Sequence, residues 1–221
     1  PKRAPRTRTK KALAAASGLG FLGANSLVIA PELGSAFIIA GLFLPLDLGS
    51  DEPVEGGLEP GEVCGSCRAC LDACPVGAIM GPGRIDTSRC LQALATVTGP
   101  WPAGAREAWG LRLYGCQSCQ DACPYNRSLA AETRTERGYI GASVPLRELL
   151  SISALEIKER FKGTALDMAW IPGQALLRNA LLAAGRRADP AVLELVRRHA
   201  PDPIPAVREA ASWAEQAIRR V

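Results

Sequence analysis

The sequence predicts an α+β fold in which a cysteine-rich module is followed by an α-helical tail. All eight cysteines of the 221 residues lie in the middle of the chain. Before all of them, residues 25–30 and 36–44 form apolar runs bounded by Gly or Pro, which is typical of short strands. After residue 144 the apolar positions recur every three or four residues, which indicates helices. A hydrophobic content of 48% fits a folded chain with one or two cores.

The first cysteine run has the spacing C-x2-C-x2-C-x3-C-P, which is typical of bacterial ferredoxins. Its members are Cys64, Cys67, Cys70, Cys74 and the following Pro75. Three cysteines in one tight loop turn their sulfurs toward a common centre and hold one [4Fe–4S] cubane. The fourth points away from that centre, so it is available to a second cubane.

The second run repeats the first at an offset of 49 residues and comprises Cys116, Cys119, Cys123 and Pro124. The position that corresponds to Cys64 is Leu113, so the repeat lacks one ligand, and the isolated Cys90 supplies it. Crossed ligation then predicts two sets of four. Cluster one takes Cys64, Cys67, Cys70 and Cys123, and cluster two takes Cys74, Cys90, Cys116 and Cys119.

Two other interpretations of the cysteines remain open at this point. Paired C-x2-C spacings also bind zinc, although zinc sites normally join separate knuckles rather than three cysteines in one loop. Disulfides suit small secreted domains, but such crowded spacing does not suit disulfide geometry. The iron–sulfur interpretation is favoured, and such clusters imply a reducing compartment, hence the cytoplasm.

The ends of the chain carry weaker signals. Residues 1–11 hold six basic and no acidic side chains, a pattern usual for a solvated arm and also compatible with RNA contact or an export signal. The apolar stretch 36–46 is about half a membrane crossing, so no membrane span is expected. His199 is the only histidine, and we expect it to be structural. No Ser/His/Asp set can be assembled, so no catalytic residue is assigned.

The tail is predicted to be a series of short helices that resemble a HEAT-type unit. One helix opens at residues 144–150, and a second opens at Ser153 with a capping box to Glu156. Further helices are expected over 173–187, after Asp189 and Asp202 as N-caps, and over 206–221. Five arginines are candidates for phosphate contact: Arg178, Arg186, Arg187, Arg197 and Arg198.

In order along the chain, these pieces resemble the C-terminal portion of the epoxyqueuosine reductase family, cobalamin-dependent iron–sulfur enzymes that act on tRNA. The resemblance rests on motifs from residue 12 to the C-terminus. They are Gly18-Leu-Gly-Phe-Leu-Gly-Ala-Asn25, Pro31-Glu-Leu-Gly-Ser35, the run from Cys64 to Ile79, Asp86-Thr-Ser-Arg-Cys90, Leu113-Tyr-Gly-Cys-Gln-Ser-Cys-Gln-Asp-Ala-Cys-Pro-Tyr-Asn126, Arg160-Phe-Lys-Gly-Thr-Ala-Leu166 and Leu177-Arg-Asn-Ala-Leu181.

The resemblance implies an oxidoreductase that reduces epoxyqueuosine to queuosine in tRNA, with electrons relayed through two [4Fe–4S] clusters to cobalamin. It implies tRNA as a partner and an electron donor such as a flavodoxin or a ferredoxin. The expected cofactor-binding residues are Gln92, Gln117, Gly20, Asn25 and Gly34.

The chain departs from the family at several positions. Ala4 stands where the family has its carboxylic acid, Ala24 replaces a lysine, and Asp167 begins a stretch that is basic in the family. We therefore expect a corrinoid domain upstream or as a separate chain. The alternative is a ferredoxin-like electron-transfer module that serves another enzyme. The predicted domains are 1–50 (basic arm and edge of a corrinoid-binding domain), 51–135 (ferredoxin-like two-cluster module) and 136–221 (helical HEAT-like tail).

Overall fold

The computed structural model describes residues 10–42, 44–127 and 138–220. The chain divides into two compact units. Within the described residues, the first unit runs to Asp86 and includes 117–127, and the second consists of 87–116 and 138–220. The predicted α+β class is confirmed, because short helices accompany two antiparallel two-stranded sheets. The three predicted domains stay a prediction.

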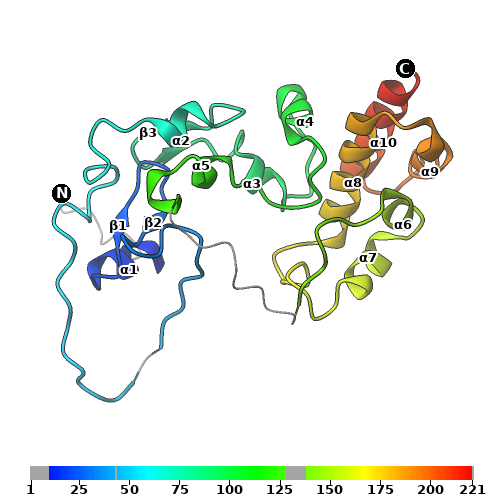
Figure 1. The fold of residues 1–221 in the computed structure, drawn as a ribbon. Coiled ribbons are helices and arrows are strands. Elements are labelled where there is room, and N and C mark those ends of the chain that lie inside the picture. The colour runs from blue at the N-terminus through cyan, green and yellow to red at the C-terminus, as the bar shows by residue number, and fades with distance from the viewer. Residues whose placement is uncertain (1–9, 43, 128–137, 221) are drawn as a thin grey trace, which may run out of the picture. The chain divides into compact units, whose positions relative to one another are not determined.

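The first unit begins with α1 (Lys10–Ala16) and a hairpin of β1 (Phe21–Leu22) and β2 (Val28–Ile29), drawn in blue in Figure 1. Phe21 pairs with Ile29, and both are buried. Gly20 precedes β1 because a Cβ there would lie 2.3 Å from the carbonyl oxygen of Ile29, so only glycine allows this approach. The hairpin therefore forms one wall of the unit's core.

The rest of the unit carries most of the cysteines. It contains α2 (Ala69–Asp72), β3 (Ile79–Gly81), β4 (Arg84–Ile85), α5 (Ser118–Asp121) and the 3₁₀ turn η1 (Pro124–Asn126). The sequence repeat is also a structural repeat. Arg68 before α2 has φ −119° and ψ 4°, and Gln117, its equivalent before α5, has φ −115° and ψ 4°.

One strand prediction is partly right and the other is wrong. Residues 25–30 contain β2, and Ala30 forms an isolated bridge with Gly34. Residues 36–44, where 43 lies outside the described residues, form no strand. Ile38 is 90% exposed and Leu42 81% exposed. A strand needs a neighbour for its N–H and C=O groups, and apolar composition alone does not supply one.

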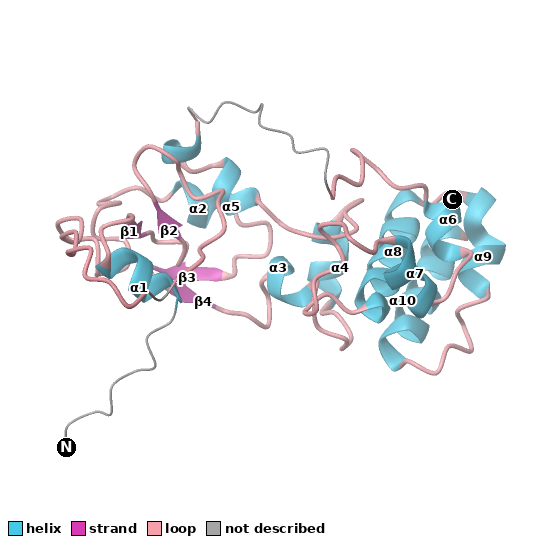
Figure 2. Cartoon of the chain, turned by 90° about the horizontal axis from the view of Figure 1, so that it is seen from below, coloured by secondary structure: helices cyan, strands magenta, loops and turns pink. Residues whose placement is uncertain are grey.

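The second unit is helical (Figure 2). It contains α3 (Leu91–Leu94), α4 (Ala103–Trp109), α6 (Leu146–Leu150), α7 (Ala154–Arg160), α8 (Gly173–Arg187), η2 (Pro190–Val192), α9 (Leu193–Arg197) and α10 (Pro205–Ile218). Helix α8 is buried along most of its length and packs against α10. The contact is close, because a Cβ at Gly185 would lie 2.4 Å from the Trp213 ring.

Most helix predictions are confirmed. Ser153 and Glu156 form the predicted capping box, and α8 has the predicted bounds. Asp189 caps η2 by accepting from the N–H of Ala191 at 2.9 Å. The prediction of Asp202 as a helix N-cap is wrong, because its carboxylate accepts from Ile204 N–H in a turn and the helix begins three residues later at Pro205.

Arg178 is the centre of a buried polar network, so its predicted contact with phosphate is wrong. The residue is 1% exposed. Its guanidinium donates to the carbonyl oxygens of Leu94 at 2.8 Å and Gly99 at 3.0 Å, to that of Val97, and to Asn179 Oδ1. Burial lowers the pKa of Arg178 to about 10, which leaves it charged at neutral pH. The charge anchors α8 to the segment after α3.

His199 has the expected structural role, since its Nε2 lies 3.0 Å from the carbonyl oxygen of Leu150. The basic arm falls outside the described residues except for Lys10 and Lys11, and Lys11 Nζ donates to Ser26 O at 2.6 Å. Within the described ranges, no helix combines the length and the apolar character that a membrane crossing requires.

Candidate metal centre

Four cysteines of the first unit line one cavity of about 120 Å³. They are Cys64, Cys67, Cys70 and Cys123, the set predicted for cluster one, and none of them is in a disulfide. The tight loop forms because Gly65 adopts φ 57° and the N–H of Cys67 donates to the carbonyl of Cys64 at 3.1 Å. The structure therefore brings together thiols from both cysteine runs.

The thiols of this cavity act on one another electrostatically. Burial raises the pKa of Cys70, and the neighbouring Cys64, Cys123 and Cys67 raise it further. Burial also raises the pKa of Cys123, while the backbone N–H groups of Tyr125 and Asn126 oppose the rise. Four thiolates in one pocket repel each other unless a cation neutralises them, so the donor set suits a cationic iron core.

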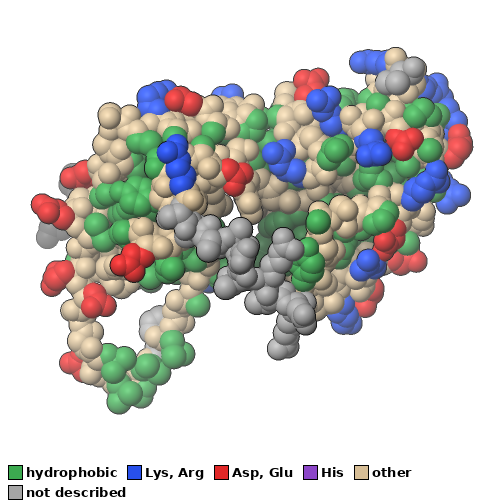
Figure 3. Space-filling model, viewed as in Figure 1, with side chains coloured by type: hydrophobic (Ala, Val, Ile, Leu, Met, Phe, Trp, Pro, Cys, Tyr) green, Lys and Arg blue, Asp and Glu red, His purple; other side chains and the backbone are tan. Residues whose placement is uncertain are grey.

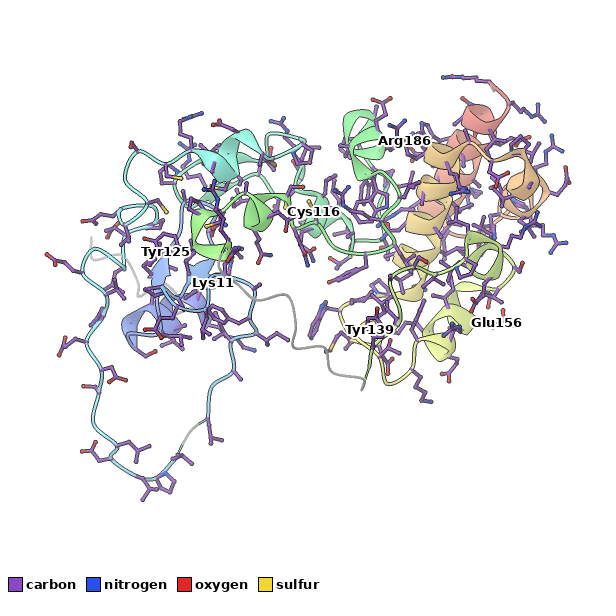
Figure 4. All side chains as sticks on the ribbon, in the orientation of Figure 1. Lys11, Cys116, Tyr125, Tyr139, Glu156 and Arg186 are labelled. Atoms are coloured by element: carbon purple, nitrogen blue, oxygen red, sulfur yellow. The ribbon has the colours of Figure 1, made fainter. Side chains whose placement is uncertain are left out.

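The cavity is built on apolar packing. Phe21, Ile29 and Cys123 form one buried cluster, and the ring of Tyr125 meets that of Phe21 edge-on at 5.1 Å (Tyr125 is labelled in Figure 4). Ala24, Cys70 and Ile79 form another. Such a shell restricts water around the thiols, which is one factor that sets a cluster's potential.

The four cysteines predicted for cluster two do not all lie in one unit. Cys74 and Cys119 belong to the first unit, and both pack against the buried side chains of Ala24, Cys70 and Ile79. Cys74 Sγ accepts a hydrogen bond from the N–H of Ala78 at 3.2 Å. Cys90 and Cys116 belong to the second unit, where Cys90 stands directly before α3. Their joint ligation stays a prediction.

The two predicted glutamines are exposed side chains close to cysteines in the chain. Gln92 lies on α3, where its Oε1 accepts from the N–H of Cys116 at 3.0 Å and its Nε2 donates to Tyr114 Oη at 3.3 Å. Gln117 stands before α5, and its carbonyl accepts the N–H of Gln120 at 2.7 Å. Gln92 thus positions the backbone of a predicted ligand.

The predicted cofactor residues around the hairpin have identifiable positions. Gly20 allows the close approach of Ile29, and Gly34 turns the chain with φ 64° in its bridge to Ala30. Asn25 lies in the hairpin loop and lines the cysteine cavity. Their contact with cobalamin stays a prediction.

Sequence reasoning missed a hydrogen-bond network that joins the loop after β2 to the second cysteine run. Asn126 Oδ1 accepts from the N–H of Ser35 at 2.7 Å, and its Nδ2 donates to Gln120 O at 2.7 Å and to Ser35 Oγ at 3.0 Å. The motifs Pro31–Ser35 and Cys123–Asn126 each end in a polar residue. Their polar ends, Ser35 and Asn126, were the available signal for this contact.

Comparison with known proteins places the site in context. Residues 63–126 match the family model described as a 4Fe-4S double cluster binding domain. The chain is 35% identical over 207 residues to the epoxyqueuosine reductase of Bacillus subtilis (strain 168), covering 92% of this chain and 52% of that protein. It is 34% identical to the enzyme of Burkholderia pseudomallei (strain K96243), covering 93% of this chain and 54% of that protein.

Solved structures agree with this relationship. A crystal structure of epoxyqueuosine reductase with a tRNA-Tyr epoxyqueuosine-modified stem loop matches with a TM-score of 0.78 and 32% identity, covering 95% of this chain and 55% of that one. The epoxyqueuosine reductase of Streptococcus thermophilus matches with a TM-score of 0.77 and 28% identity, covering 96% and 55%. The chain spans about half the length of these proteins, and in sequence and fold it is similar to the epoxyqueuosine reductases, with residues 63–126 matching a double-cluster domain.

Proposed function

We propose that this chain holds two [4Fe–4S] clusters and takes part in the reduction of epoxyqueuosine to queuosine in tRNA. The observation that carries the proposal is the cavity shared by Cys64, Cys67, Cys70 and Cys123. It brings cysteines of both runs together, as crossed ligation requires, within a chain whose relatives are epoxyqueuosine reductases.

The cluster ligands are proposed as two sets of four. Cluster one is held by Cys64, Cys67, Cys70 and Cys123, and cluster two by Cys74, Cys90, Cys116 and Cys119. When bound, the clusters supply single-electron transfer at potentials set by burial and by N–H bonds to sulfur. The chain's own residues hold the thiolates in place: Gly65 turns the first loop, and Gln92 holds the Cys116 backbone.

We propose cobalamin as the electron acceptor, with Gln92 and Gln117 among the residues facing it. Both amides are exposed, so they can contact a cofactor held mainly by another domain. The reaction also requires a proton donor, and we assign this role to none of the residues that the structure describes. The corrinoid domain is proposed to lie upstream or in a separate chain.

An exposed apolar loop supports such a partner domain. Ile38, Leu42, Leu46 and Leu48 are between 67% and 90% exposed, and Figure 3 shows this loop as a green projection at the lower left. Apolar surface of this kind is usually covered by a neighbour. We propose that this segment is the edge of the corrinoid-binding domain.

The helical tail is proposed to be HEAT-like and to contact tRNA. The solved relative is described with a tRNA stem loop, which supports this assignment. Arg186, labelled in Figure 4, and Arg198 are exposed, whereas Arg197 is hydrogen-bonded to Glu194 and Glu215. The reaction needs an external reductant, proposed to be a flavodoxin or ferredoxin, and a cytoplasmic setting fits a tRNA substrate.

The alternative is a ferredoxin-like module that delivers electrons to another corrinoid or redox enzyme. Ala4, at the position of the family's acid, is the observation that favours it. Both functions share the clusters, so the experiment must separate electron delivery from tRNA modification.

The chain, reconstituted anaerobically with iron and sulfide, is combined with a corrinoid domain, cobalamin, a reduced flavodoxin and tRNA that carries epoxyqueuosine. We expect queuosine among the digested nucleosides by mass spectrometry. Cobalamin reduction without queuosine would favour the alternative. A colourless protein that contains zinc instead of iron would contradict both.

A further inference from the structure

Asn25 has a buried polar atom without a partner at the cavity proposed for cluster one. The side chain is 6% exposed and lines the cavity together with Cys64, Cys67, Cys70 and Cys123. Its Nδ2 makes no hydrogen bond within the described part of the chain. A buried donor without an acceptor costs free energy, so its presence calls for an acceptor that the protein atoms do not supply.

The hairpin loop fixes which end of the Asn25 amide is the donor. Oδ1 accepts from the N–H of Leu27 at 3.2 Å, which assigns the oxygen and leaves the NH2 group as the other end. Leu27 is held in turn, because its carbonyl accepts from the N–H of Gly23 at 2.8 Å. The amide is therefore positioned by the backbone before any cofactor is present.

The neighbouring positions leave Asn25 little freedom. A Cβ at Gly23 would lie 2.9 Å from Asn25 Oδ1 and 2.5 Å from Ile29 Cδ1, so a larger residue there would displace the amide. Ser26 adopts φ 62°, and its N–H donates to the carbonyl of Gly23 at 2.9 Å. The positive φ of Ser26 is unfavourable for a residue other than glycine, and the turn that contains it holds Asn25 at the cavity wall.

We propose that Asn25 Nδ2 donates a hydrogen bond to a sulfur of the cluster held by Cys64, Cys67, Cys70 and Cys123, and that this bond raises the cluster's reduction potential. The inference rests on the proposed cluster site. Sulfur atoms of a cluster accept N–H bonds, and such bonds stabilise the more negatively charged reduced state. Asn25 thereby acts on cluster one rather than on the corrinoid.

The test compares two substitutions that remove the donor in different ways. Asn25→Asp keeps the oxygen that accepts from Leu27 N–H, removes the NH2 group and adds negative charge. Asn25→Leu has nearly the same size, adds no charge and loses the turn bond. Ser26→Gly is the control, because it changes the same turn and leaves Asn25 in place.

The reduction potentials of both clusters are measured in the reconstituted full chain by EPR-monitored titration. We expect cluster one to shift to a more negative potential in both Asn25 variants, with cluster two unchanged and Ser26→Gly like the wild type. A shift only in Asn25→Asp would indicate charge alone, and a shift only in Asn25→Leu would indicate the turn. Either result, or no shift, overturns the inference.

A second measurement covers the case in which Asn25→Leu does not retain cluster one. The wild-type chain is labelled with ¹⁵N in the side-chain amides of asparagine, and pulsed EPR is recorded on reduced cluster one. We expect a nitrogen coupling that disappears in Asn25→Asp, while any coupling from the nearby Asn126 remains. Absence of such a coupling overturns the inference and leaves the proposed function intact. A wild-type protein without iron would instead refute the proposed function.

Discussion

Gln92 Oε1 lies 3.0 Å from the backbone nitrogen of Cys116 and accepts its hydrogen bond, although the two residues are 24 positions apart. The bond links α3 to the start of the second cysteine run. Cys116 is a proposed ligand of cluster two, so the side chain of Gln92 restrains the position of its backbone.

Gln92→Leu should speed the loss of cluster two, because removal of one neutral hydrogen bond typically costs about 1 kcal/mol. Gln92→Glu retains the acceptor oxygen and is the matched control. The measurement is the decay of visible absorbance under a chelator, with cluster one as the internal reference. Equal decay rates in Gln92→Leu and the wild type would contradict the assigned role.

Crossed ligation predicts a specific pattern for cysteine variants. Cys70→Ser should remove cluster one and Cys74→Ser cluster two, each lowering the iron and sulfide content by about half. In the Cys74→Ser variant, an additional Cys90→Ser substitution should cause no further loss of iron, because both cysteines belong to cluster two. In the Cys70→Ser variant, the same addition should remove the remaining cluster. Iron and sulfide analysis with EPR checks this, and the opposite dependence would mean that the ligand sets are wrong.

Arg178 should tolerate no substitution by an apolar side chain of similar length. Arg178→Met leaves the carbonyls of Leu94, Val97 and Gly99 without their donor, and buried unsatisfied groups cost about 1–3 kcal/mol each. We expect a loss of at least about 3 kcal/mol in the free energy of unfolding, measured by denaturant titration. Arg186→Met, on an exposed side chain of the same helix, should change it little.

The capping box of α7 should make stability depend on pH. Hydrogen bonds from the backbone and side chain of Ser153 lower the pKa of Glu156 below its ordinary value of 4.5. A lowered folded-state pKa gives stabilisation that is present above the unfolded pKa and is lost as pH falls through the folded pKa. The stability difference between wild type and Glu156→Ala should therefore shrink below pH 4.5.

Thermal unfolding followed by circular dichroism at pH 7 and at lower pH tests this difference in the full chain. Ser153→Ala should cost about 1 kcal/mol at pH 7, as is usual for loss of an N-cap. Glu156→Gln keeps an acceptor for the Ser153 N–H without a titrating carboxylate, so it should show a weaker pH dependence. A difference that grows on acidification would be inconsistent with the lowered pKa.

A substitution at Gly20 tests whether this glycine has a structural role or a cofactor-binding role. Gly20→Ala places a Cβ 2.3 Å from Ile29 O and should lower the free energy of unfolding by about 1–3 kcal/mol. Gly104→Ala is the control, because nothing lies within 4 Å of its Cβ position and alanine favours helix α4. Denaturant unfolding without cobalamin measures both. An unchanged stability for Gly20→Ala would leave a cofactor role as its explanation.

Local signals in the sequence predicted the helical half of the fold well. The capping residues Ser153 and Asp189 and the bounds of α8 follow from neighbouring residues, whose chemistry acts within one or two turns. The prediction of a strand over 36–44 was wrong, because a strand needs a second strand to pair with and apolar content does not identify that partner.

By itself the sequence determined the two cysteine runs, their repeat and the resemblance to the epoxyqueuosine reductases, because ligand spacing is a local property of the chain. The sequence also predicted which four thiols would meet, and the structure places those four around one cavity. Only the tertiary structure decided that Asn25 lines this cavity with an amide nitrogen unpaired among the described residues, and that Arg178 is buried rather than facing phosphate. These facts depend on contacts between segments tens of residues apart. Burial and hydrogen-bond satisfaction over such separations are set by packing, which no local pattern encodes.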